Sequence, residues 1–275
     1  MRVLVTDSDN RSTLAATRSL ARAGHTVITA GERRDSLAAV SRFSTAFVQY
    51  PRPFDEPERF VDAICHAVRV NSIDVVLPMT EVTTLLLTEQ RLRLPSSCTL
   101  PFASVESIAM ASNKAAVVDL ARRVGVPTPR TIAVASEVGA VIEANTLRFP
   151  IVIKPARSRV RSVDGWISTR VAYAVDAADL ESKLRRLRPD VFPVLLQERI
   201  HGRGIGVFAC YDQGRPVAFF SHERLREKPP SGGISVLSRS TALNPVAVDY
   251  SKRLLDRLGW HGVAMVEFKN DDRDG

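Results

Sequence analysis

The sequence predicts an α/β domain with a parallel sheet over residues 1–104, followed by an α+β domain over residues 105–275. In the first part of the chain, short apolar runs alternate with helical patterns, which is typical of parallel strands joined by helices. In the second part, short strands separated by turns outnumber the helices, which favours antiparallel pairing. A chain of 275 residues is long enough for two domains of about 100 to 200 residues each.

The first domain opens with a strand, a helix and a second strand, which is the start of a parallel, Rossmann-like sheet. Asn10 offers a cap for the helix, and Gly24 stands where the helix ends. In the next helix, Phe60, Ile64 and Val68 recur every four residues and define one buried face. The expected elements are strand 3–5, helix 12–23, strand 25–30, helix 57–70 and strand 73–77.

The loop after the first strand argues against the dinucleotide site that such a sheet often carries. It reads Thr6-Asp7-Ser8-Asp9-Asn10 and contains no glycine. A dinucleotide-binding loop needs glycines so that the backbone can approach the pyrophosphate. We therefore expect no NAD in this domain. For Asp7 and Asp9 we expect turn and capping roles rather than contact with a substrate.

The second domain begins with a helix that starts at Ser112 and ends at Gly125, before the stiff connector Val126–Pro129. Beyond it, the expected strands are 151–154, 166–171, 194–199, 205–211, 216–221 and 262–269, and the expected helices are 177–187 and 246–258. Asp212–Arg215 is the expected turn of a hairpin between the strands 205–211 and 216–221.

A long basic segment follows this hairpin. Residues 222–233 read His-Glu-Arg-Leu-Arg-Glu-Lys-Pro-Pro-Ser-Gly-Gly. We interpret them as a loop, because long loops of this kind often carry function. Arg224, Arg226 and Lys228 are then candidates for contact with phosphate or with a substrate carboxylate, and a solvated charged loop is the alternative.

The formal net charge of +8 permits a polyanionic partner such as ATP or nucleic acid. No zinc-finger spacing, RNA-binding motif or basic run with interleaved aromatic residues is present, so we expect no nucleic-acid partner. No apolar run approaches the roughly 20 residues that span a bilayer, and the first residues do not resemble a signal peptide. We therefore expect a cytoplasmic protein with no membrane partner.

Five short motifs follow one another in the second domain: Asn113-Lys114, Val126–Pro129, Phe149–Pro155, Leu195–Gly202 and Val263–Lys269. Their order and spacing resemble the ATP-grasp superfamily, whose members hold ATP between two α+β lobes. The likeness is to carboxylate–amine or thiol ligases and to the ATP-binding region of carbamoyl-phosphate synthase. Residues 1–104 look like the α/β domain that usually precedes the ATP-grasp domain, and residues from about 130 to 195 look like its lid.

Two lysines fall where the superfamily binds phosphate. A lysine at the end of the apolar strand Ile151–Lys154 needs an anionic partner for its ammonium group. The resemblance implies that Lys154 and Lys114 hold the phosphates of ATP. Hydrogen bonds to charged groups contribute about 1.5–3 kcal/mol each. A solvated helix residue is the alternative for Lys114.

The resemblance also implies a site for the base and a site for a metal. Gln197 to Ile200 match the adenine hinge, in which backbone groups and Glu198 read the base edge and Ile200 packs near the ring. Glu267 matches the first metal-binding carboxylate and would hold Mg²⁺ beside the phosphates. The alternatives are a strand-end salt bridge for Glu198 and a cross-strand pair near Lys269 for Glu267.

The sequence departs from the superfamily in three places. The lid loop Ala156–Gly165 carries arginines where glycine and serine are usual. Ile205 lies near the usual place of a ribose-binding glutamate, so ribose recognition is unassigned. The strand of Glu267 is followed by Asp271–Gly275, which reads as a turn, and the Glu-x-Asn-x-Arg strand of the superfamily is absent. We therefore expect the ATP-grasp domain to be incomplete at its C-terminal end.

These implications predict an ATP-binding, Mg²⁺-dependent ligase. It would activate a carboxylate as an acyl phosphate for attack by an amine or a thiol, with Arg226 and Lys228 acting on the substrate. Two alternatives stay open, namely a non-catalytic ATP-binding module or decayed ligase, and a basic nucleic-acid-binding protein. The sequence names neither the carboxylate nor the nucleophile, and assembly into a homo-oligomer also stays open.

Overall fold

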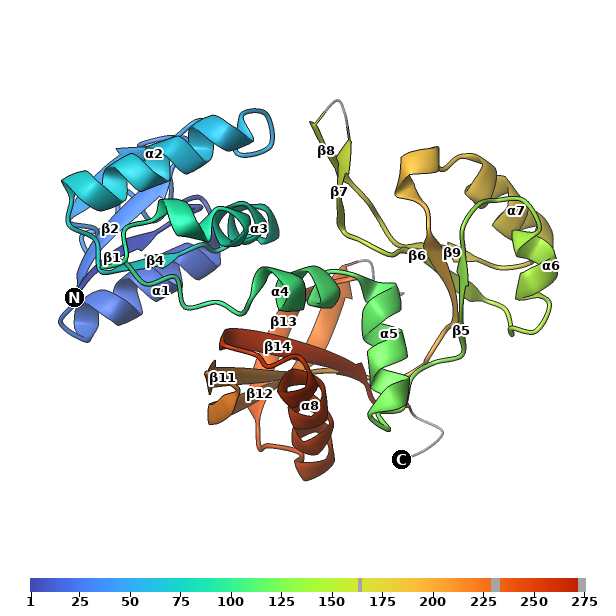
Figure 1. Ribbon diagram of the computed structural model, residues 1–275. Helices are drawn as coiled ribbons and strands as arrows, with labels where there is room; N and C mark the ends of the chain where they lie inside the picture. The colour runs from blue at the N-terminus through green and yellow to red at the C-terminus, as the bar shows by residue number, and fades with distance from the viewer. Residues whose placement is uncertain (163–164, 229–232, 272–275) are drawn as a thin grey trace. The chain divides into compact units, whose positions relative to one another are not determined.

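The computed structural model describes residues 1–162, 165–228 and 233–271. The chain forms two compact units, the first made of residues 1–105 and 161–167 and the second of residues 106–160 and 168–275. Figure 1 shows helices and strands in both units. Throughout the described ranges, every helix is too short or too polar to cross a bilayer.

The first unit is built on a parallel sheet of four strands in the order β3-β2-β1-β4. Its strands are β1 (Arg2–Val5), β2 (Thr26–Gly31), β3 (Ala46–Gln49) and β4 (Val75–Leu77). Its helices are α1 (Arg11–Arg22), α2 (Pro57–Val70) and α3 (Glu81–Glu89), with the 3-10 turn η1 (Arg91–Arg93). The expected parallel sheet is confirmed, and β3 and α3 are added to the expected elements.

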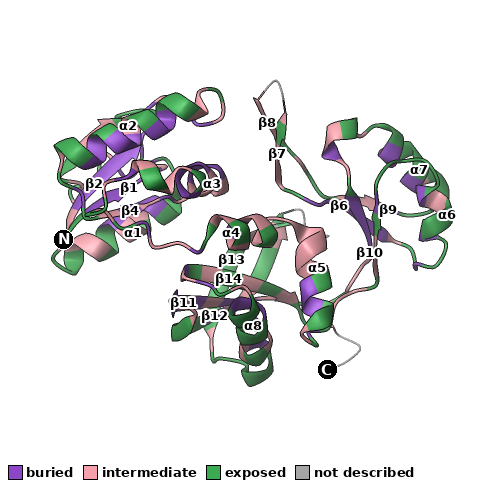
Figure 2. Ribbon diagram, in the orientation of Figure 1, coloured by how far each residue is buried: buried purple, intermediate pink, exposed green. Residues whose placement is uncertain are grey.

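The core of the first unit lies between the sheet and α2. Phe60, Ile64 and Val68 are at most 2% exposed, and they belong to one buried cluster with Leu4 of β1 and Ile28 of β2. Figure 2 shows buried residues along one side of α2 and along these strands. The four-residue spacing in the sequence therefore marks the face of α2 that packs on the sheet.

Asp7, in the loop after β1, has a left-handed backbone with φ of 57°. Its carboxylate accepts hydrogen bonds from the Thr83 hydroxyl (2.7 Å), the Met79 N–H (3.0 Å) and the Thr80 hydroxyl (3.2 Å). These contacts join the end of β1 to the start of α3, which lies more than 70 residues further along the chain.

The second unit contains two antiparallel sheets. The small sheet has the order β5-β10-β6-β9 and the long sheet the order β13-β12-β11-β14. The strands are β5 (Thr131–Val134), β6 (Ile151–Pro155), β9 (Ala172–Ala174), β10 (Val194–Glu198), β11 (Gly204–Asp212), β12 (Arg215–Lys228), β13 (Ile234–Thr241) and β14 (Gly262–Lys269). The helices are α4 (Val105–Ala111), α5 (Lys114–Arg123), α6 (Ala140–Ala144), α7 (Ala177–Arg185) and α8 (Pro245–Arg257), with the 3-10 turn η2 (Pro189–Val191).

Helices cover one face of each sheet in this unit. In the small sheet, α6 and α7 pack against the edge strands β5 and β9, and Leu180 and Leu184 of α7 are buried. In the long sheet, Val266 and Phe268 of β14 pack against a buried cluster that includes Leu254 of α8. Side chains alternate along a strand, so Glu267 and Lys269 of β14 lie on the opposite face of the long sheet.

Three sequence-based predictions of local structure were wrong. Residues 222–228, expected to be a loop, form the second half of β12 and pair with β13, because the long hairpin compensates the weak strand preference of charged residues. Residues 229–232 of that segment lie outside the described residues. The strand expected over 166–171 ends early, with β8 (Gly165–Ser168), and residues 169–171 belong to no strand. The expected lid loop contains the strand β7 (Arg159–Ser162), which pairs with β8.

Candidate functional site

Lys154 of β6 lies on the face of the small sheet that is opposite Ile151 and Ile153. Its Nζ donates a hydrogen bond of 2.6 Å to Oε1 of Gln197, on the neighbouring strand β10. The Gln197 amide in turn donates a hydrogen bond of 2.8 Å to the Thr131 hydroxyl of β5. Gln197 is 6% exposed. The structure thus makes this predicted hinge residue a clamp that orients the lysine.

The surroundings of Lys154 disfavour its positive charge. Burial is the main cause that lowers the pKa of Lys154, and the nearby charges of Lys114 and Lys269 lower it further. We call these three residues the lysine cluster. Among the described residues, the hydrogen-bond partner of Lys154 is the neutral amide of Gln197. A bound anion would stabilise the ammonium group of Lys154, which is half-buried.

Lys114 reaches the cluster from the first turn of α5. The Asn113 side chain caps this helix and accepts hydrogen bonds from the N–H groups of Ala115 (3.0 Å) and Ala116 (3.3 Å). The Lys114 N–H donates to the carbonyl of Ala156 (2.7 Å), and its Nζ donates to the Ser158 hydroxyl (3.0 Å). The Asn113-Lys114 motif thus combines a helix cap with a cation placed beside the segment that follows β6.

Glu198 and Ile200 lie at and just after the end of β10. Glu198 pairs with Ile151, so its side chain faces away from Lys154. Its carboxylate accepts the N–H of Arg148 (3.1 Å) and lies 3.8 Å from the guanidinium of Arg130. These contacts match the strand-end salt bridge that was the alternative for Glu198. Ile200 is half-buried in the link between β10 and β11.

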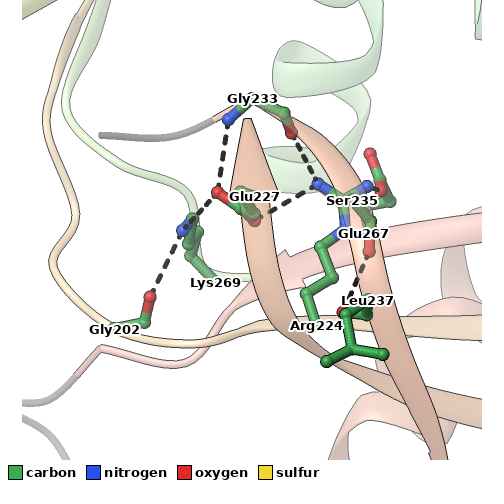
Figure 3. A network of polar contacts seen from close by, with 8 residues as sticks. All are labelled: Gly202, Arg224, Glu227, Gly233, Ser235, Leu237, Glu267 and Lys269. Carbon is green, nitrogen blue, oxygen red and sulfur yellow. Dashed lines mark hydrogen bonds and ion pairs between the residues drawn. The ribbon is translucent and has the colours of Figure 1, made fainter. Parts of the chain in front are cut away.

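Glu267, the predicted metal ligand, forms an ion pair with Arg224 of β12 (Figure 3). The Arg224 guanidinium also lies 3.4 Å from the carboxylate of Glu227. Glu227 is in turn 3.7 Å from Nζ of Lys269, which donates a hydrogen bond of 3.2 Å to the carbonyl of Gly202. Lys269 therefore belongs both to the lysine cluster and to this chain of alternating charges.

The structure does not bring Arg226 and Lys228 into this network. Both side chains are exposed on β12, and within the described part of the chain no ion pair involves either of them. They lie on the strand that carries Arg224 and Glu227, so their assignment to a substrate stays a prediction.

The donor set allows one carboxylate for a magnesium ion. Among the described residues, no three His, Cys, Asp or Glu side chains gather in a group that would hold a metal. Magnesium is usually bound by one or two carboxylates together with substrate phosphates and waters. The carboxylate of Glu267, whose side chain is 46% exposed, fits that role only in company with phosphate oxygens.

Sequence reasoning missed Lys269 and Glu227 and left the glycines at 202, 204 and 206 without a role. A usable signal was the spacing of Glu267 and Lys269, because residues two apart share a face of a strand. Two of these glycines make room for side chains: a Cβ built on Gly204 would lie 2.9 Å from Cδ of Arg224, and one built on Gly206 would lie 2.7 Å from Nε2 of His222.

Replacing Gln197 with leucine is expected to lower the free energy of unfolding by about 1–3 kcal/mol, because the buried Lys154 loses its acceptor. Urea unfolding of the unliganded protein measures this change. Gln49→Leu, at an exposed position of β3, is the matched control and should change stability by less than about 0.5 kcal/mol. Equal stability of the two variants would contradict the clamp role of Gln197.

Solved structures match the chain over nearly its whole length. An L-amino acid ligase from Bacillus licheniformis aligns at 15% identity and a TM-score of 0.72, covering 99% of this chain and 64% of that one. A biotin carboxylase from Campylobacter jejuni, in complex with β-γ-ATP, aligns at 17% identity and a TM-score of 0.75, covering 99% and 62%. The biotin carboxylase domain of the 2-oxoglutarate carboxylase from Hydrogenobacter thermophilus, a dimer with MgADP, ADP and bicarbonate, aligns at 15% identity and 0.75, covering 99% and 61%.

These solved proteins are ATP-grasp enzymes. The chain therefore has the ATP-grasp fold, and the resemblance drawn from the five motifs is confirmed at the level of the fold. The chain spans less than two thirds of the length of each of the three. No protein-family model and no curated protein matches it.

Proposed function

We propose that the protein binds ATP through the lysine cluster of its second unit. The observation that carries this proposal is Lys154, which is half-buried near two further lysines and bonded to a neutral amide. A triphosphate supplies the negative charge that these groups need, and hydrogen bonds to charged groups contribute about 1.5–3 kcal/mol each.

The face of the small sheet that carries Lys154 also carries apolar side chains. Val152 and Leu195 are at most 5% exposed, and they lie on the same face as Lys154 because each belongs to the row of paired residues on that side. In the proposed complex the adenine ring packs toward this face and toward Ile200, and the backbone of residues 198–200 reads the base edge.

The proposed reaction is the activation of a carboxylate as an acyl phosphate, followed by attack of an amine or a thiol. Lys114, Lys154 and Lys269 would hold the phosphates, and Arg226 and Lys228 would contact the substrate. A magnesium ion, when bound at Glu267, would neutralise charge on the transferred phosphoryl group. Support comes from the fold, which the chain shares with an L-amino acid ligase and with carboxylases bound to ATP analogues or MgADP.

A non-catalytic ATP-binding module is the second candidate. The ion pair between Glu267 and Arg224 favours it, since a guanidinium occupies the carboxylate that the reaction assigns to metal. Titration calorimetry with ATP, in EDTA and in magnesium, tests binding. Release of phosphate from ATP, assayed with a panel of amino acids as carboxylates, tests turnover. Binding with magnesium-dependent turnover supports the ligase, binding alone supports the module, and absence of binding contradicts both.

Nucleotide affinity is expected to fall as the pH rises. The fall should begin at a lower pH than it would for a lysine with an ordinary pKa. Burial and the neighbouring lysines lower the pKa of Lys154, so its ammonium form is lost as pH rises through that lowered value. Bound phosphate favours the ammonium form, so binding near this pH takes up a proton. Calorimetry in buffers of different ionisation enthalpy measures the uptake. Lys154→Met should abolish it, and uptake that persists in this variant would assign the proton elsewhere.

A further inference from the structure

We propose that Arg224 acts as an internal counter-cation for Glu267, so that metal binds at Glu267 only after a nucleotide has bound. This inference rests on the proposed function, because it concerns the order in which nucleotide and metal enter the same site. Arg224 is assigned here as a positioning residue.

The Arg224 side chain crosses a whole strand to reach its partner. Strand β11 lies between β12, which carries Arg224, and β14, which carries Glu267. A Cβ built on Gly204 of β11 would lie 2.9 Å from Cδ of Arg224 and 3.1 Å from Oε1 of Glu227. Since both distances are shorter than ordinary contacts, the guanidinium reaches Glu267 through the space that the missing side chain leaves.

Arg224 has a second carboxylate within reach. One of its nitrogens lies 3.4 Å from Oε1 of Glu227 and donates to the carbonyl of Gly233 at 3.3 Å, while another contacts Glu267 (Figure 3). The Glu227 side chain is 10% exposed and the Glu267 side chain 46%. When Glu267 turns toward a metal, the guanidinium therefore keeps a buried anionic partner.

The surrounding charges oppose a free metal ion. Arg224 and Lys269 lie on the same face of the long sheet as Glu267, and Arg224 already neutralises its carboxylate. A divalent cation entering alone would meet two carboxylates, Glu267 and Glu227, that already pair with Arg224 and Lys269, and it would be repelled by these two cations. Bound phosphates reverse this balance, because they neutralise the lysine cluster and offer oxygen ligands beside Glu267.

Binding of Mn²⁺, measured by the loss of its free-ion electron paramagnetic resonance signal beyond the loss in a protein-free solution of Mn²⁺ and ADP, tests the order. In the full chain, Mn²⁺ should bind in the presence of ADP and not in its absence. In Arg224→Ala, Mn²⁺ should bind without ADP, with affinity raised by about tenfold or more. Arg224→Lys keeps a cation but lacks the fork of donors, and should lie closer to the unsubstituted protein.

Gly204→Ala provides a second variant that keeps the charge of Arg224. Its methyl group displaces the Arg224 side chain, so Mn²⁺ should again bind without ADP. Arg239→Ala is the control, because Arg239 pairs with Glu223 rather than with Glu267, and it should behave as the unsubstituted protein does. Glu267→Gln should remove Mn²⁺ binding in every background.

Equal Mn²⁺ affinity with and without ADP in the unsubstituted protein would overturn the inference, as would unchanged Mn²⁺ binding in both Arg224→Ala and Gly204→Ala. In either case ADP binding that depends on Lys154 would leave the proposed function intact. Failure of ADP to bind at all would remove the proposed function and the inferred order together.

Discussion

Replacing Lys154 with alanine is expected to weaken ATP binding by about 1.5–3 kcal/mol, which is roughly a 10- to 150-fold rise in Kd. The reason lies in the geometry of the site. Lys154 is held by the clamp of Gln197 and Thr131, so little side-chain freedom is lost when phosphate binds, and its burial strengthens the attraction. Titration calorimetry with ATP at neutral pH measures the change.

Lys252→Ala is the matched control for this experiment. Lys252 is an exposed lysine of α8, so the variant loses the same charge at a position outside the lysine cluster, and its ATP affinity should stay within about twofold of the unsubstituted value. If Lys154→Ala and Lys252→Ala bind ATP equally well, the lysine cluster is not the phosphate site and the proposed function is wrong.

Replacing Phe60 with alanine is expected to lower the unfolding free energy of the first unit by about 3–5 kcal/mol. Phe60 is fully buried in the core between α2 and the parallel sheet, and its ring meets Tyr50 edge-on with 4.9 Å between ring centres. The substitution removes apolar burial and leaves a cavity, and the aromatic contact is lost as well. Hydrogen exchange resolved along the chain measures the loss in residues 1–105.

Val70→Ala in the same helix is the control. Val70 is 67% exposed, and its substitution should change stability by less than about 0.5 kcal/mol. Below the unfolding transition, Phe60→Ala should keep the nucleotide affinity of the second unit. Loss of protection in Phe60→Ala no greater than in Val70→Ala would contradict the assignment of Phe60 to the core.

The sequence was sufficient to predict those elements in which the spacing of apolar residues marks the buried face. The spacing of Phe60, Ile64 and Val68 predicted helix α2 and its buried face, because that period belongs to a helix and to no strand. The apolar run that ends at Lys154 predicted both strand β6 and a lysine in need of an anion. In each case the signal lay within a few consecutive residues.

Charged strands were beyond this reasoning. Five of the six residues of Glu223–Lys228 are charged, so no alternation of apolar and polar residues marks the segment as a strand. Its pairing with β13 supplies the stability that its composition lacks. The face of the small sheet on which Glu198 lies could not be predicted from the sequence either. A shift of one residue in the register of β10 would place its carboxylate on the face of Lys154.

Contacts across several strands were the least predictable part of the site. Arg224 and Glu267 are far apart in sequence, and they meet only because β12, β11 and β14 are neighbours in that order. Lys269 joins Lys154 through the arrangement of two separate sheets in one unit. The motif resemblance identified Lys114 and Lys154 from their places in the sequence. Their partners, Ser158 and Gln197, could be found only from the structure.

The space above Gly204 makes the residues allowed at positions 204 and 224 depend on each other. A larger residue at 204 leaves the side chain at 224 in place only if residue 224 becomes shorter, and a shorter residue at 224 removes the reason for glycine at 204. The two positions are therefore expected to diverge together among descendants of this chain. A lineage that loses Arg224 no longer needs glycine at 204. With both positions changed, the carboxylate of Glu267 would have lost the cation that pairs with it here.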